Sequence, residues 1–91
     1  MTSLEKTTKE LTLLLLYLNS WEEKALDETY RRSWKGYDFG DLNELSGEEL
    51  IFDPKRSKSI IFNDSGIKQA KALAEKYGVD VSAFEPASIK E

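Results

Sequence analysis

Cysteine and histidine are both absent from this sequence of 91 residues. Without cysteine there is no disulfide framework and no thiolate metal site, which fits a reducing compartment. Without histidine the chain lacks the commonest general base and the commonest metal ligand in proteins. These two absences count heavily against an enzyme. We therefore expect a non-enzymatic protein that needs no metal and no cofactor.

Long apolar runs and targeting signals are absent as well. The most apolar stretch, residues 11–18, is far shorter than the roughly 20 residues that span a bilayer. The N-terminus lacks a basic segment followed by an apolar core and a cleavage site, so no signal peptide is expected. The sequence thus predicts a cytoplasmic protein that makes no contact with a membrane.

Positive charge is in the minority. Thirteen basic and seventeen acidic side chains give a net charge of -4, the wrong sign for holding nucleic acid through the overall field. A local basic patch can still exist. A chain of this length forms one domain, residues 1–91, which buries only about 60% of its unfolded surface. We expect an ordered core at about residues 3–85 and a disordered tail beyond Pro86.

The first predicted helix spans Ser3 to Ser20 and is unusually rich in leucine. Helical spacing directs one stripe towards the core, namely Leu4, Leu11, Leu14, Leu15, Leu18 and Trp21. A second apolar set lies off this stripe and consists of Leu13, Leu16 and Tyr17. A surface helix of a monomer should not be apolar nearly all round. Either another part of the chain covers the second set, or it forms the interface of a homodimer, and we predict the homodimer.

Two further helices are expected before the middle of the chain. Residues 22–33 place Leu26, Tyr30 and Trp34 at intervals of four, which is consistent with a helix of about three turns. Asp38 is a natural N-cap for a short helix from Phe39 to Ser46. The buried side of that short helix is expected to hold Phe39, Leu42 and Leu45.

A hairpin and a last helix follow. Residues 50–53 and 58–63 are rich in branched and aromatic side chains, and Asp53 with Pro54 suits the first two positions of a type I turn between them. Alternation places Ile60 and Phe62 on one face and Ile61 on the other. The last helix, capped by Asn63, runs to Tyr77 and stops at Gly78, and the segment after it should dock through Val81 and Phe84.

Two stretches carry a resemblance. The segments L-I-F-D-P-K and K-S-I-I-F-N-D-S-G are similar to the wing and the wing-to-helix junction of bacterial winged-helix regulators of the MarR and PadR kind. The segment W-K-G-Y-D-F at residues 34–39 resembles a W-K-G-aromatic-D-aromatic motif in an uncharacterised family of short bacterial proteins. The resemblance implies an α+β, mainly helical, winged helix-turn-helix-like domain with a two-stranded β-hairpin wing.

A winged helix that binds DNA would use its third helix and its wing. Candidate contacts to DNA or to another partner are the cations near these elements and one polar residue of the helix, namely Arg31, Arg32, Lys35, Asn43, Lys55, Arg56 and Lys58. Residues 38–53, however, contain six acids and no lysine or arginine, which is unfavourable next to phosphates. Basic residues at a hairpin tip can also serve only to prevent edge pairing, and the two arginines can pair with Asp27 and Glu28 within a helix.

Aromatic residues are the other feature of the central segment. Most should be buried, but Trp34 and Tyr37 form a candidate hot spot for a protein partner if they are exposed. The sequence therefore favours a non-enzymatic protein-interaction module on a winged-helix scaffold, which contacts an unknown protein through its acidic third helix and the surrounding aromatics. The alternative is a transcriptional regulator that binds double-stranded DNA through the basic wing tip.

Overall fold

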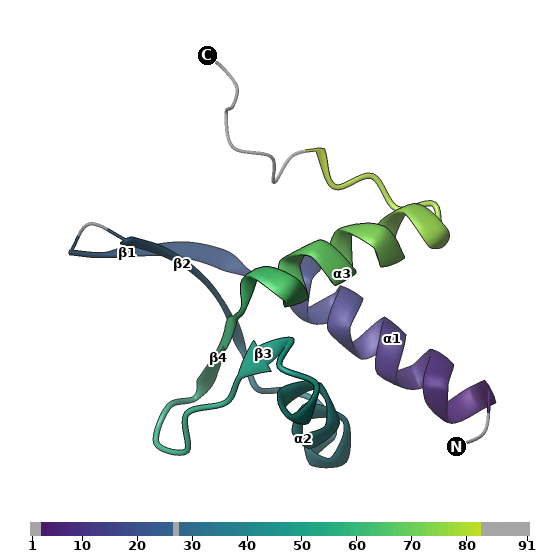
Figure 1. Cartoon of the computed structure of the whole chain (residues 1–91), viewed down its shortest axis with the longest axis horizontal. Helices are drawn as coiled ribbons and strands as arrows, with labels where there is room; N and C mark the ends of the chain where they lie inside the picture. The colour runs from purple at the N-terminus through teal and green to yellow at the C-terminus, as the bar shows by residue number, and fades with distance from the viewer. Residues whose placement is uncertain (1–2, 27, 83–91) are drawn as a thin grey trace.

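The computed structural model describes residues 3–26 and 28–82. Within these residues the fold is α+β, with three helices and four strands (Figure 1). In chain order the elements are α1 (Ser3–Leu18), β1 (Trp21–Ala25), β2 (Glu28–Trp34), α2 (Phe39–Gly47), β3 (Ile51–Phe52), β4 (Ser59–Phe62) and α3 (Asp64–Lys76). None of the helices in the described ranges has the length and apolar character needed to span a membrane.

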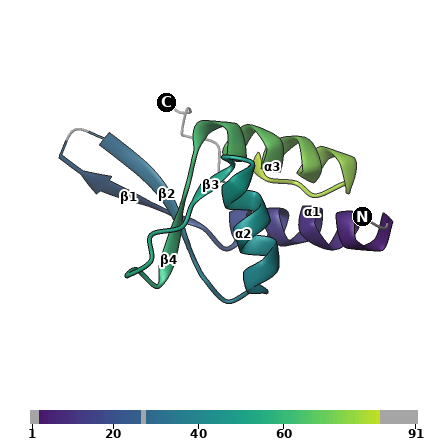
Figure 2. The same ribbon diagram turned by 60° about the horizontal axis from the view of Figure 1, so that its bottom comes forward.

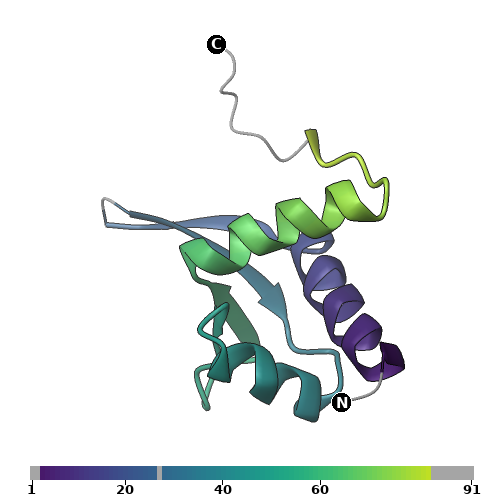
Figure 3. The same cartoon turned by 45° about the vertical axis from the view of Figure 1, so that its right-hand side comes forward.

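The four strands form one antiparallel sheet in the order β1-β2-β4-β3. The β1–β2 hairpin projects from the body of the molecule (Figure 1), because β4 pairs only with the last three residues of β2. All three helices lie to one side of the strands (Figure 2). Figure 3 shows α2, in teal, at the end of the molecule that holds β3 and β4. The sheet thus has one face that the helices cover and one that they leave open.

The leucine-rich helix α1 is oriented differently from the prediction. Leu13, Leu16 and Tyr17 are 1%, 0% and 1% exposed and pack in the core of this single chain. The prediction that these three residues form a dimer interface is therefore wrong. The homodimer was predicted from these residues, so their burial removes the reason for it. Leu4 and Leu15, expected in the core, are 76% and 46% exposed. Two overlapping apolar stripes run along α1, and the contacts with α3 and the sheet determine which of the two is buried.

The predicted helix at residues 22–33 is wrong, since this segment forms the β1–β2 hairpin. A spacing of four residues places side chains on one face of a helix, but it also places them on one face of a strand, where the period is two. The chain turns at Leu26, whose φ of 58° is left-handed and whose side chain is fully exposed. Residues 22–33 therefore do not supply the first helix of a helix-turn-helix. The helix that lies between β2 and β3 is α2.

The third predicted helix is confirmed as α2. The Asp38 carboxylate accepts a hydrogen bond from the backbone N–H of Asp41 at 3.1 Å, as its role as N-cap requires. Leu42 and Leu45 are buried as expected. Phe39 is not, since it is 73% exposed at the start of the helix, and the prediction that it belongs to the buried side is wrong.

The β3–β4 hairpin is confirmed, with Ile60 and Phe62 buried on one face and Ile61 half-buried on the other. Its turn lies one residue later than expected, because the Ser57 N–H donates to the Pro54 carbonyl at 3.2 Å. Lys55 and Arg56 are therefore the two corner residues.

The last helix is confirmed as α3, but the Asn63 side chain does not cap it and donates instead to the Glu49 carbonyl. Gly78 follows α3 with a left-handed φ of 71°, as a helix stop of this kind requires. Val81 packs against the core, which agrees with the docking expected beyond the helix. Phe84 and the tail beyond Pro86 lie outside the described residues.

Candidate binding site on the open sheet face

The register of the sheet assigns side chains to its two faces. Residues that oppose each other in antiparallel strands project from the same face. Pairing therefore joins Trp21 to Arg32, Arg32 to Ile61, and Ile61 to Phe52 in one row across all four strands. The alternation of β2 adds its neighbours two positions away. We call this surface the outer face, and its members include Trp21, Glu23, Glu28, Tyr30, Arg32, Trp34, Phe52, Ser59 and Ile61.

The outer face exposes large aromatic side chains. Trp34 is 62% exposed and Phe52 is 56% exposed. The rings of Trp21 and Trp34 lie beside each other with their centroids 4.9 Å apart. Soluble proteins seldom leave several large rings together in water without using them for binding. The outer face is thus a candidate binding surface.

Arg32 lies within the outer face and is held in place. Its guanidinium donates to the hydroxyls of Ser59 at 3.0 Å and Ser57 at 3.2 Å, and lies 3.5 Å from the Glu23 carboxylate. These contacts fix the planar group before any partner arrives, which lowers the entropy cost of binding.

Arg31, the neighbouring candidate, points to the opposite face and has a structural role. Its guanidinium lies 5.6 Å from the centre of the Tyr17 ring, donates to the Ser20 hydroxyl at 2.6 Å, and pairs with Glu22 across the hairpin at 3.8 Å. Each arginine thus pairs with a glutamate of the neighbouring strand, while Asp27, one of the partners expected within a helix, lies outside the described residues. Successive residues of a strand face opposite ways, so the structure separates Arg31 from Arg32.

A hollow of about 580 Å³ adjoins the outer face at the β3–β4 loop. We call it the loop hollow, and it is lined by Trp34, Lys35, Gly36, Phe39, Asp53, Lys55, Ser57 and Lys58. Lys35 binds the loop to the end of β2, since its ammonium lies 2.6 Å from the Asp53 carboxylate and 2.6 Å from the Pro54 carbonyl. The hollow therefore combines two exposed aromatic rings with several lysines.

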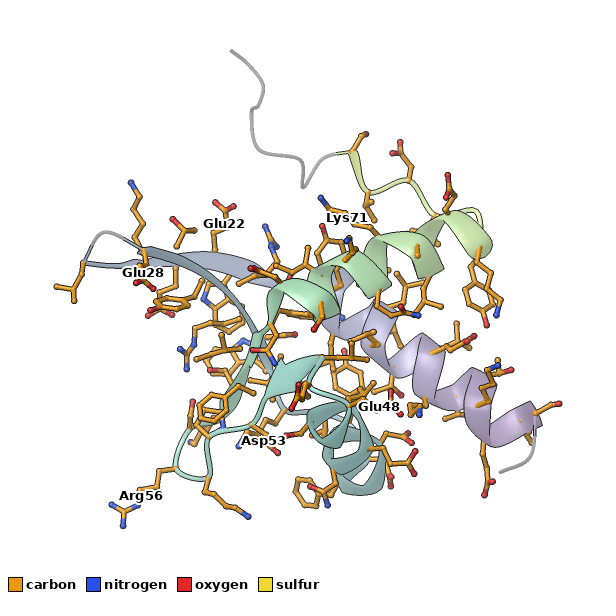
Figure 4. The ribbon with its side chains drawn as sticks, viewed as in Figure 1. Glu22, Glu28, Glu48, Asp53, Arg56 and Lys71 are labelled. Atoms are coloured by element: carbon orange, nitrogen blue, oxygen red, sulfur yellow. The ribbon has the colours of Figure 1, made fainter. Side chains whose placement is uncertain are left out.

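The cations of the β3–β4 loop remain available for a partner. Within residues 3–26 and 28–82, no ion pair neutralises Lys55, Arg56 or Lys58. Arg56 stands at the tip of the loop and points away from the rest of the molecule (Figure 4). Asp53 is the one acid that lines the loop hollow, and Lys35 pairs with it. The net charge at this end of the sheet is positive.

The acids of α2 lie elsewhere. Lys9 of α1 pairs with Glu44 at 3.5 Å and with Glu48, and the hydrogen bond to Glu48 raises the pKa of Lys9. Asp38, Asp41 and Glu44 line a separate hollow between α1 and α2. Figure 4 shows Glu48 on the side of α2 that faces α1. The carboxylates expected to contact a partner thus face α1, away from the loop hollow.

Two predicted residues of the central segment have other surroundings. Asn43 is exposed on α2. Tyr37 packs against the core, and its hydroxyl accepts a hydrogen bond from the Asn19 amide at 3.1 Å. It lines a second, shallow hollow together with Trp34, Asn19, Ser33 and Gly36, which contains no cation. Trp34 and Tyr37 therefore share a hollow, but only Trp34 also lines the loop hollow.

Phe39 and Phe52 were missed as candidate site residues. Both are exposed aromatic side chains, and Phe52 lies close to the basic loop in the sequence. The signal for Phe52 was available, since the alternation that buries Ile51 directs the next residue outwards. Phe39 gave no such signal, because its spacing from Leu42 matches a buried helix stripe.

The helical layer is joined by a cluster of polar side chains that is distant from the loop hollow. The Glu10 carboxylate of α1 accepts hydrogen bonds from the Lys76 ammonium and the Tyr77 hydroxyl, both at 2.9 Å. The hydrogen bond from Lys76, followed by that from Tyr77, lowers the pKa of Glu10 below its ordinary value. In the described ranges, no group of three or more acidic side chains is arranged to hold a metal ion.

Residues 4–80 match the profile of a family described as a domain of unknown function, DUF6429. This agrees with the expectation of a family without an assigned role, while the W-K-G-aromatic-D-aromatic motif and a bacterial source stay predictions. No curated protein and no solved structure matches the chain significantly. Because the matched segment covers most of the sequence, the chain belongs to the family of this domain of unknown function (DUF6429).

Proposed function

We propose that the chain is a non-enzymatic interaction module on a winged-helix-like scaffold, which binds an anionic partner through the outer face and the loop hollow. One observation carries the proposal. Exposed aromatic rings lie beside cations that no ion pair in the described residues neutralises, in a chain whose net charge is -4. A protein that needed these cations only for solubility would have no reason to gather them around aromatic rings.

The sequence favoured a protein partner that contacts the acidic helix α2. The charge distribution of the structure favours the outer face as the contact surface instead. Glu44 and Glu48 are paired with Lys9, so a partner at α2 would have to break these ion pairs. The outer face contains tryptophan, tyrosine and arginine, the residue types that dominate binding hot spots. An acidic protein segment is thus one class of partner for this surface.

A DNA-binding transcriptional regulator is the second candidate function. The order of α2, β3, β4 and α3 supports a winged-helix scaffold, with Lys55 and Arg56 at the tip of the wing. The acids of α2 weigh against the insertion of that helix into a major groove, since they would meet phosphates.

The test uses polyanions of different chemistry. Fluorescence anisotropy would be measured with labelled poly-glutamate and a labelled random DNA duplex, at about 50 mM and about 200 mM salt. The variants are Lys55→Glu/Arg56→Glu in the loop and Lys6→Glu/Lys68→Glu as a control of equal charge on the helical side. We expect wild type to bind at least one probe, the loop variant to lose it and the control to keep it. Absence of all binding, or equal loss in both variants, would overturn the proposal.

A further inference from the structure

We infer that the loop hollow is a site for single-stranded nucleic acid, with bases stacked on both Trp34 and Phe39 and the adjoining phosphates held by the lysines of the β3–β4 loop. This inference rests on the proposed function, since it names the class of the anionic partner. It follows from three features of the hollow: its exposed rings, its charge and its volume.

The rings suit a base. Trp34 is 62% and Phe39 73% exposed, and both line the loop hollow. Trp34 comes from the end of β2 and Phe39 from the start of α2, so rings from two elements meet at one hollow. Stacking of bases on aromatic side chains is the main source of affinity for single strands, and it is tolerant of sequence.

The charge suits a phosphate chain. Lys55 and Lys58 line the hollow, and Arg56 stands between them in the sequence at the tip of the loop. The acid that lines the hollow, Asp53, is paired with Lys35. Three other carboxylates of the central segment, those of Asp38, Asp41 and Glu44, line the hollow between α1 and α2 instead.

The exposed rings and the volume of the hollow favour a single strand over a duplex or an acidic peptide. In a duplex the faces of the bases are stacked on each other, so they are not free to lie on Trp34 or Phe39. Aspartate and glutamate side chains carry the charge of an acidic peptide but have no ring to stack. A volume of about 580 Å³ lies within the range of ligand sites, roughly 300–1,000 Å³.

The experiment compares strands with and without bases. The full-length protein would be titrated with an oligothymidine of about 12 nucleotides, with an abasic strand of the same number of phosphates, and with a duplex of the same length. Binding is followed by anisotropy of the labelled strand and by tryptophan fluorescence, which stacking on Trp34 should quench. We expect oligothymidine to bind about tenfold or more tightly than the abasic strand.

Variants assign the stacking to the hollow. Phe39→Ala should weaken oligothymidine binding about tenfold and leave the abasic strand unchanged. Leu4→Ala is the control, since Leu4 is an apolar side chain that is 76% exposed, much like Phe39, and lies on α1 outside both the outer face and the loop hollow. Lys55→Gln/Lys58→Gln should reduce the slope of log affinity against log salt by about 1.4, since each phosphate contact to a single strand contributes about 0.7. Phe39 and Leu4 are both exposed, so loss of the fold is not expected in either variant, and thermal melts would verify this.

The outcomes separate the inference from the proposed function. If oligothymidine and the abasic strand bind equally, or if Phe39→Ala weakens oligothymidine binding no more than Leu4→Ala does, the inference is wrong while the anion-binding module stands. Tighter binding of the duplex or of poly-glutamate than of oligothymidine also overturns the inference and identifies the other partner class. If no polyanion binds, both proposals fail.

Discussion

The two faces of the sheet are built from the same four strands, yet they have opposite surroundings. On the inner face Ile51, Ile60 and Phe62 are 1%, 0% and 5% exposed beneath the helices. On the outer face their neighbours Phe52 and Trp34 are more than half exposed. Both faces are rich in apolar side chains, so hydrophobicity alone does not distinguish a core from a binding surface. The difference comes from the helices, which all lie to one side.

The largest contrast is expected between two phenylalanines of the same hairpin. Phe62→Ala should lower the free energy of unfolding by about 3–5 kcal/mol, because it removes a buried ring that contacts Tyr17 edge-on. Phe52→Ala should lower it by less than about 1 kcal/mol, since more than half of its surface is exposed. Urea denaturation measures both values. Equal losses would mean that the outer face is part of the core and is not reserved for a partner.

The next largest loss of stability is expected at Gly66, where the start of α3 lies close to the backbone of Leu50. A Cβ at Gly66 would lie 1.9 Å from the Leu50 carbonyl oxygen and 3.2 Å from the Phe62 ring. Gly66→Ala must therefore displace the start of α3, at a cost of about 3 kcal/mol in the free energy of unfolding. Gly47→Ala, with nothing within 4 Å of the added methyl, is the control and should change stability far less. A Gly66→Ala protein as stable as wild type would contradict this packing.

Two buried serines sharpen the comparison. The Ser33 hydroxyl, on the inner face, has no hydrogen-bond partner among the described residues, whereas the Ser59 hydroxyl on the outer face accepts from Arg32. Ser33→Ala should leave stability unchanged or raise it by up to about 1 kcal/mol, and Ser59→Ala should lower it by about 1 kcal/mol. The two variants differ by the same single atom, so chemical denaturation of both gives a direct contrast. The opposite order would show that Ser33 has a partner and Ser59 does not need one.

The smallest effect concerns the helical layer that covers the inner face. Contacts with Lys76 and Tyr77 lower the pKa of Glu10 in the folded state. These contacts therefore stabilise the fold fully at a pH above 4.5, the ordinary pKa of the group, and the stabilisation is lost as the pH falls through the lowered pKa. Glu10→Gln should therefore be slightly less stable than wild type near neutral pH. The difference should shrink and vanish in acid. Denaturation at several pH values measures it, and a constant difference would exclude this linkage.

The sequence predicted the elements with unambiguous periodicity. α2, the β3–β4 hairpin and α3 were expected within one or two residues, because Asp38, Gly78 and the alternation at residues 60–62 are local signals. The β1–β2 hairpin was missed because side chains spaced by four fit a helix and a strand alike. The buried stripe of α1 was misassigned because its apolar residues surround most of the helix, so only tertiary packing selects a side.

The candidate site could be predicted only in part. Lys35, Lys55, Lys58 and Trp34 were named from the sequence, and the structure brings these four to the loop hollow. Their arrangement depends on the pairing of β2 with β4, which joins segments about 25 residues apart and leaves no local signal. The inward orientation of Arg31 follows from the same strand.

The most direct test of the loop hollow as a site for single-stranded nucleic acid is an NMR titration of the isotope-labelled protein with oligothymidine. The account predicts that the indole N–H of Trp34 and the backbone amides of the β3–β4 loop shift most, that Phe39 and its neighbours follow, and that the amides of α3 hardly change. Shifts that cluster on the acidic hollow between α1 and α2, or no shift at all, would contradict it.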